Sequence, residues 1–123
     1  MRLLVIEDDP DLNRQLATAL TDAGYVVDRA FDGEEGHYLG ETEPYDAVIL
    51  DIGLPKMDGH EVAAKIRREP WGRPVCLIAV TGWSDETDRA KSRAAGFDHH
   101  LVKPLDTAHL AQLLDDVARS ARG

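Results

Sequence analysis

Short runs of apolar residues alternate along the chain with longer segments in which apolar residues recur every three or four positions. Short runs are typical of strands buried on both faces, and the longer period is typical of helices with one apolar face. The clearest strand ends in Ala47-Val48-Ile49-Leu50-Asp51. The pattern predicts strands at 3–6, 26–30, 45–51, 75–80 and 100–102, and helices at 10–23, 33–41, 59–68, 85–95 and 105–119. This alternation predicts a single α/β domain over residues 1–123, with helices covering both faces of a parallel sheet.

Local signals mark the ends of the first helix and a weakness in the second. Asp9 before Pro10 predicts a helix start with an aspartate N-cap, and Gly24 predicts where that helix ends. Gly36 and Gly40 lie inside the second predicted helix, where each glycine costs about 1 kcal/mol relative to alanine. Two explanations stay open: the glycines let the helix approach the sheet closely, or they are tolerated at the surface.

The charge and the cysteine content narrow the functional classes. The chain has 14 Lys and Arg against 23 Asp and Glu, a net charge of −9, so we expect no direct contact with nucleic acid, which requires clustered basic residues. Cys76 is the one cysteine, which excludes an internal disulfide, and its apolar surroundings predict a buried thiol in a reducing compartment. The apolar runs are too short to cross a membrane, and the N-terminus lacks the apolar core of a signal peptide. These features predict a cytoplasmic protein with no membrane partner.

Polar residues stand where the predicted strands end: Glu7, Asp8 and Asp9 after the first, Asp51 at the end of the third, Thr81 after the fourth and Lys103 after the fifth. The carboxyl ends of parallel strands meet at one edge of the sheet, where ligands bind. Converging carboxylates repel one another, and a hard cation such as Mg²⁺ with oxygen ligands would hold them ionised. A carboxylate beside such a cation, with a hydroxyl and an ammonium group nearby, predicts a site for phosphoryl transfer.

The arrangement of Glu7-Asp8, Asp51, Thr81 and Lys103-Pro104 closely resembles the receiver domain of two-component response regulators, over essentially the whole chain. The resemblance implies a flavodoxin-like three-layer sandwich with strand order 2-1-3-4-5. It also implies that Asp51 accepts a phosphoryl group from a phosphohistidine on a sensor histidine kinase or phosphotransfer protein, with Thr81 and Lys103 assisting. Such a domain is not an enzyme for a separate substrate, because it promotes only its own phosphorylation and dephosphorylation.

The same resemblance implies a set of metal ligands and a switch. Asp8 and Asp51 would bind Mg²⁺ directly, Glu7 would bind it through water, and the backbone carbonyl of Gly53 would be a further ligand. Asp9 is expected to cap the first helix instead. In the switch, Thr81 moves toward the phosphate and a fifth-strand aromatic residue follows. That position here is His100, which is smaller and polar.

The sequence motifs in the two halves of the chain resemble two different groups of receivers, here called two styles. Up to Ile66, phrases such as residues 53–59 resemble receivers of winged-helix transcription factors, whereas residues 81–84 and 96–104 resemble receivers of hybrid histidine kinases. The two styles would join near residues 69–74. Natural divergence and a constructed chimera both explain this pattern. Winged-helix regulators dimerise through the fourth helix, fifth strand and fifth helix, so the resemblance allows a homodimer through the fourth and fifth helices.

Three alternative functions share part of the pattern. An aspartyl-nucleophile phosphohydrolase also needs a second aspartate two residues after the first, where this chain has Gly53. A flavodoxin-type flavin carrier needs a glycine- and hydroxyl-rich phosphate loop, where the acidic residues 7–9 would repel phosphate. An engineered receiver-like scaffold without a physiological partner would keep the same motifs. His99 and His100 lack a matching metal-ligand cluster and are expected to be surface or half-buried side chains.

Overall fold

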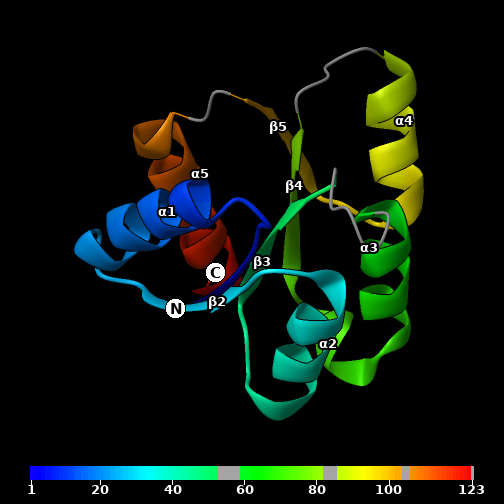
Figure 1. The fold of residues 1–123 in the computed structure, drawn as a ribbon, viewed down its shortest axis with the longest axis horizontal. Helices are drawn as coiled ribbons and strands as arrows, with labels where there is room; N and C mark the ends of the chain where they lie inside the picture. Colours follow the sequence, from blue (N-terminus) through cyan, green and yellow to red (C-terminus); the bar gives the residue numbers. More distant parts are fainter. Residues whose placement is uncertain (53–58, 82–85, 104–105, 123) are drawn as a thin grey trace.

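The computed structural model describes residues 1–52, 59–81, 86–103 and 106–122 (Figure 1). Its elements are β1 (Arg2–Ile6), α1 (Pro10–Asp22), β2 (Val26–Ala30), α2 (Gly33–Thr42), β3 (Ala47–Asp51), α3 (Gly59–Arg68), a 3₁₀ helix η1 (Pro70–Gly72), β4 (Cys76–Thr81), α4 (Glu86–Ala95), β5 (His99–Val102) and α5 (Thr107–Arg122). All neighbouring strands run parallel, in the order β2-β1-β3-β4-β5. The predicted flavodoxin-like fold and strand order are confirmed.

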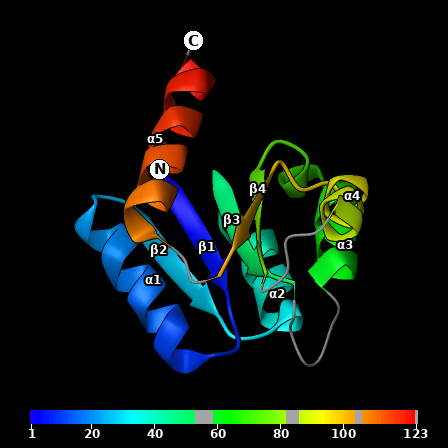
Figure 2. The same cartoon turned by 90° about the horizontal axis from the view of Figure 1, so that it is seen from above.

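The sheet is the middle of three layers. Helices α1 and α5 cover one face, and α2, α3 and α4 cover the other, as Figures 1 and 2 both show. Successive side chains of a strand point to opposite faces, so each strand contributes to two cores. The core under α1 and α5 includes Leu3, Val5, Leu16, Leu20, Ile49, Ile78, Leu110 and Leu114. The core under α2 and α3 includes Leu4, Ile6, Val48, Leu50, Val62, Ile66, Leu77 and Phe97.

Most predicted boundaries agree with the structure to within a residue or two. Asp9 caps α1 as predicted, because its Oδ1 accepts the backbone N–H groups of Asp11 at 3.0 Å and Leu12 at 3.4 Å. Gly24 follows α1 with φ of 101°, a value that favours glycine. Helix α5 begins later than predicted because the Oδ1 of Asp106 accepts the N–H groups of residues 108 and 109 at 3.0 and 3.3 Å.

Gly36 and Gly40 allow close approach to α2, which decides between the two explanations for them. A Cβ atom at residue 36 would overlap the side chain of Ile6 in β1, and one at residue 40 would overlap the indole of Trp71 in η1. Both glycines are buried. Helix α2 therefore lies against the sheet and against η1 at distances that only glycine permits.

Cys76 is less buried than the sequence predicted. It is half-buried at the start of β4, because the first residue of this strand lies at the margin of the core under α5. Burial and the nearby charge of Asp98 raise the pKa of its thiol to about 11. In the part of the chain that the structure describes, no helix is both long enough and apolar enough to cross a membrane.

Candidate functional site at the carboxyl edge of the sheet

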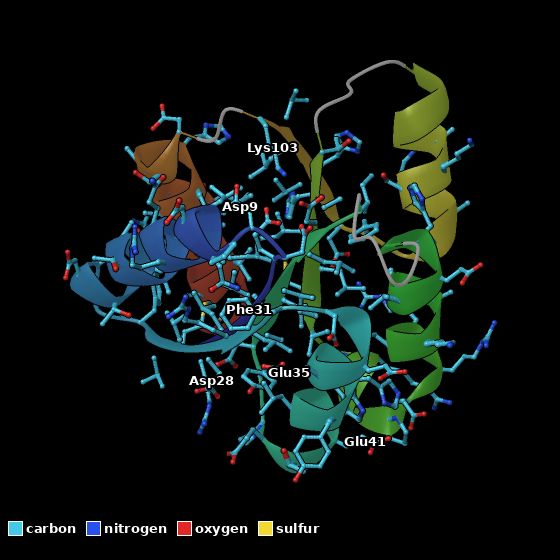
Figure 3. The ribbon with its side chains drawn as sticks, viewed as in Figure 1. Asp9, Asp28, Phe31, Glu35, Glu41 and Lys103 are labelled. Atoms are coloured by element: carbon cyan, nitrogen blue, oxygen red, sulfur yellow. The ribbon has the colours of Figure 1, made fainter. Side chains whose placement is uncertain are left out.

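The predicted site residues meet at the carboxyl edge of the sheet. Glu7 directly follows β1, Asp51 and Thr81 are the last residues of β3 and β4, and Lys103 directly follows β5. The parallel register places Asp51 opposite Val80, so the ends of β3 and β4 lie level. In Figure 3, Lys103 lies on the same side of the molecule as Asp9, the N-cap residue of α1.

Lys103 joins two buried carboxylates. Its Nζ donates a hydrogen bond of 2.8 Å to Asp51 Oδ2 and lies 3.3 Å from Glu7 Oε1. The side chains of Asp51 and Glu7 are 7% and 2% exposed, whereas that of Lys103 is 33% exposed. The backbone N–H of Lys103 donates to the carbonyl of Thr81 at 2.7 Å, which holds residue 103 beside the end of β4. An ammonium group therefore bridges the ends of β1 and β3 from β5.

A buried amide that the sequence analysis did not identify holds Glu7 in place. Asn13 of α1 is fully buried, and its Nδ2 donates bonds of 3.0 Å to the carbonyls of both Glu7 and Ala30. Arg29 Nε donates to Asn13 Oδ1 at 2.6 Å, so the amide uses both of its ends. The signal that could have revealed Asn13 is its position on the apolar face of α1, one turn before Leu16.

The buried carboxylate of Glu7 has an unusual affinity for protons. Burial, followed by hydrogen bonding to Asp51 and Asp8, raises the pKa of Glu7 to about 8. Lys103 does not cancel this effect, because its ammonium lies closer to Asp51, at 2.8 Å, than to Glu7, at 3.3 Å. Burial alone would lower the pKa of Lys103, but its bond to Asp51 and its contact with Glu7 outweigh burial and raise it. Three carboxylates around one ammonium group thus leave this edge short of positive charge.

The acidic residues fit a hard cation. One carboxylate oxygen from each of Glu7, Asp8 and Asp51 lies within 4.8 Å of the others. Octahedral Mg²⁺ binds oxygens at about 2.0–2.1 Å, which places its ligands about 3–4 Å apart. Among the described residues, the buried Glu7 Oε1 makes no hydrogen bond beyond its ion pair with Lys103, and Asp8 is exposed. The predicted contribution of Gly53 falls outside the described residues.

The residues predicted to form the switch lie on β4 and β5. Thr81 is buried, with 3% of its surface exposed. His100 is half-buried and shares a hydrogen bond of 3.0 Å between its Nδ1 and the Oγ of Ser92 in α4. His99 is also half-buried, as expected. Neither histidine belongs to a converging group of metal-binding side chains in the part of the chain that can be placed.

Known proteins resemble this chain along nearly its whole length. The model of the response regulator receiver domain family matches residues 3–115. The transcriptional activator protein IrlR of Burkholderia pseudomallei is 36% identical over 119 residues, covering 97% of this chain and 51% of IrlR. The chain thus spans about half the length of that curated relative, and of the transcriptional regulators SilR and CusR.

Solved structures of receiver proteins have the same fold as this chain. The chemotaxis protein CheY4 of Vibrio cholerae is 26% identical, with a TM-score of 0.90 over 94% of this chain and 97% of that chain. The receiver domain of a sensor histidine kinase from Pseudomonas aeruginosa PAO1, solved with magnesium coordinated in its active site cleft, is 32% identical, with a TM-score of 0.86 over 94% of both chains. A transcriptional activator and the receiver domain of a sensor histidine kinase each match nearly the whole chain, and the division into two styles stays a prediction. The chain belongs to the response regulator receiver domain family.

Proposed function

We propose that Asp51 accepts a phosphoryl group from a phosphohistidine on a sensor histidine kinase or a phosphotransfer protein. The observation that carries this proposal is the position of the Asp51 carboxylate. It is nearly buried at the end of β3, 2.8 Å from the Lys103 ammonium and beside the carboxylates of Glu7 and Asp8. Buried carboxylates held by a cation at the carboxyl edge of a parallel sheet are suited to phosphoryl chemistry.

In the proposed step, an oxygen of the Asp51 carboxylate attacks the phosphorus atom of the phosphohistidine. The new P–O bond forms an acyl phosphate as the P–N bond breaks, and the imidazole of the donor leaves with the bonding electrons. Lys103 would neutralise charge on the phosphoryl oxygens, and the Thr81 hydroxyl would donate a hydrogen bond to one of them. Asp8 and Asp51 would hold Mg²⁺ directly and Glu7 through water, and the bound cation would neutralise the remaining phosphoryl charge.

The partners follow from the same proposal. Because the donor is a phosphorylated protein of a signalling pathway, we place the domain in the cytoplasm, where it would promote only its own phosphorylation and dephosphorylation. Direct contact with nucleic acid by this domain is not proposed, since its net charge is −9. A homodimer through α4 and α5 is the proposed route by which the phosphorylated form passes on its signal, by analogy with receivers of transcription factors.

Intact-mass measurement after incubation with acetyl phosphate tests the proposal. We expect one phosphoryl group on the wild-type chain with Mg²⁺ and none with a chelator. Asp51→Asn should remove labelling, whereas Asp22→Asn, which changes an exposed aspartate in α1, should keep it. Labelling that persists in Asp51→Asn, or that does not depend on Mg²⁺, would overturn the proposal.

A further inference from the structure

We propose that His37, Glu41 and Glu69 form a second metal site, which takes a divalent transition-metal ion such as Zn²⁺. His37 and Glu41 are one turn apart on α2, and Glu69 lies between α3 and η1. One ring nitrogen of His37 and one carboxylate oxygen from each glutamate lie within 4.8 Å of one another. None of these residues takes part in the phosphoacceptor site.

The fold brings these three side chains together through the contact between α2 and η1. The indole of Trp71 lies against Gly40, at a distance that a Cβ atom would not permit. This contact places Glu69, two residues before Trp71, beside α2. The Trp71 and His37 rings meet edge to face, with centroids 6.1 Å apart and planes at 72°, which restricts the orientation of the imidazole. The half-buried ring of Trp71 thus holds the histidine in place.

Glu69 directs its carboxylate toward His37. It occupies the N-cap position of η1, but its side chain makes no capping hydrogen bond. Its Oε1 lies 3.8 Å from His37 Nε2, and Glu41 Oε1 lies 3.4 Å from His37 Nδ1. Within the described residues, no hydrogen bond joins His37 to either glutamate. The two glutamates therefore approach different nitrogens of the His37 ring, at separations wider than a hydrogen bond.

One ligand atom from each of the three residues lies within 4.8 Å of the others, which is within reach of a small tetrahedral ion bound to one nitrogen of the His37 ring. Zn²⁺ binds histidine nitrogen and carboxylate oxygen at about 2.0–2.2 Å, so two ligands of one tetrahedral ion lie about 3.3 Å apart. An imidazole combined with carboxylates favours Zn²⁺ and related transition metals over Mg²⁺, which prefers oxygen ligands alone. The side chains of His37, Glu41 and Glu69 are 32%, 50% and 38% exposed, which leaves access for the ion and for a water as fourth ligand. Figure 3 shows Glu41 on the side of α2 that faces the chain after α3.

Calorimetric titration with Zn²⁺ tests the site, with excess Mg²⁺ present to occupy the carboxylates at the sheet edge. We expect one Zn²⁺ to bind and to raise the thermal unfolding midpoint, because the ion would link α2 to η1 only in the folded state. His37→Ala and Glu69→Gln should each weaken the association at least tenfold. Titration with Co²⁺ should give the strong visible absorption of a tetrahedral ion, and His37→Ala should remove it.

Two matched controls separate this site from general metal binding. His109→Ala removes an exposed histidine of α5, and Glu35→Gln removes one exposed charge of α2 that does not face His37. Both variants should bind Zn²⁺ as the wild type does. If His37→Ala does not fold, Glu69→Gln alone decides, because it keeps the backbone hydrogen bonds of residue 69. If Glu69→Gln and Glu35→Gln bind Zn²⁺ with equal affinity, or if the wild type does not bind Zn²⁺, the proposal is overturned.

Discussion

Ser92 Oγ and His100 Nδ1 share a hydrogen bond of 3.0 Å that joins α4 to β5. Ser92 is 1% exposed and His100 is half-buried, so this partly buried bond holds the imidazole against the helix. A Tyr or Phe ring at position 100 would lack an equivalent ring nitrogen to share with Ser92. In this chain a polar contact with α4 thus occupies the position where related receivers are expected to have a mobile aromatic ring.

The first prediction is that this bond restrains His100 when a phosphate mimic such as beryllofluoride binds. In the wild type, the NMR signals of the His100 ring should shift only slightly, because moving the ring breaks a partly buried hydrogen bond worth about 1 kcal/mol. Ser92→Ala should enlarge the shift by removing that restraint. His99→Ala, on the opposite face of β5, is the control. If the His100 signals are identical with and without the mimic, in wild type and in Ser92→Ala alike, then His100 takes no part in the switch.

The second prediction concerns crowding among the carboxylates. In a chelator, Asp51→Ala should raise the free energy of unfolding by about 1 kcal/mol, because Glu7 could then ionise and take Lys103 as its own partner. Mg²⁺ should stabilise the wild type against urea, and this stabilisation should be lost in the variant. Asp22→Ala should respond to Mg²⁺ as the wild type does. If Asp51→Ala is as stable as the wild type or less stable in chelator, the carboxylates of the site do not repel one another enough to destabilise the fold.

The third prediction concerns Arg67 of α3, which ties together the segments before β4 and β5. Its guanidinium donates to the carbonyls of Gly72 at 2.9 Å, Val75 at 2.7 Å and Gly96 at 2.8 Å, and to Asp98 Oδ2 at 2.8 Å. Arg67→Lys should lower the free energy of unfolding by about 2 kcal/mol, because one ammonium cannot reach all of these acceptors.

Urea unfolding measures this loss, and the neighbouring exposed residue supplies the control. Arg68→Lys, one residue further along α3, should change stability by less than about 0.5 kcal/mol. Equal stabilities of the Arg67 and Arg68 variants would show that the hydrogen bonds of Arg67 contribute nothing beyond its charge.

The fourth prediction is a pH dependence at the opposite edge of the sheet. Burial would raise the pKa of Asp28, but hydrogen bonds from Tyr45 at 2.7 Å and Arg2 at 2.8 Å outweigh burial and lower it. A lowered pKa stabilises the fold above the ordinary aspartate pKa of about 4, and this stabilisation is lost as pH falls through the folded-state value. Asp28→Asn should therefore cost about 1 kcal/mol at pH 7.

Urea unfolding as a function of pH checks this expectation. The difference in free energy between wild type and Asp28→Asn should be constant near neutral pH and should shrink in acid. The exposed Asp22→Asn should show no such change. A difference between wild type and Asp28→Asn that is independent of pH would assign the effect to packing rather than to the charge of Asp28.

The amino-acid sequence by itself determined the elements, their order and the edge where the site lies. Helix α3 occupies residues 59–68 as predicted, and Asp9 caps α1 as predicted. These features depend on periodicity and capping, which act over a few neighbouring residues. Asp51 and Lys103 could also be placed from sequence, because the ends of parallel strands meet at one edge regardless of how the side chains pack.

Only the tertiary structure decided which side chains meet. The bond from Ser92 to His100, the indole of Trp71 against Gly40, and the buried amide of Asn13 under Glu7 join different elements. Contacts of this kind depend on how closely two elements pack, to within a fraction of an ångström, and a local pattern in either element carries no information about that distance. The half-exposure of Cys76 has the same origin, since apolar neighbours in the chain specify a strand but not what covers its first residue.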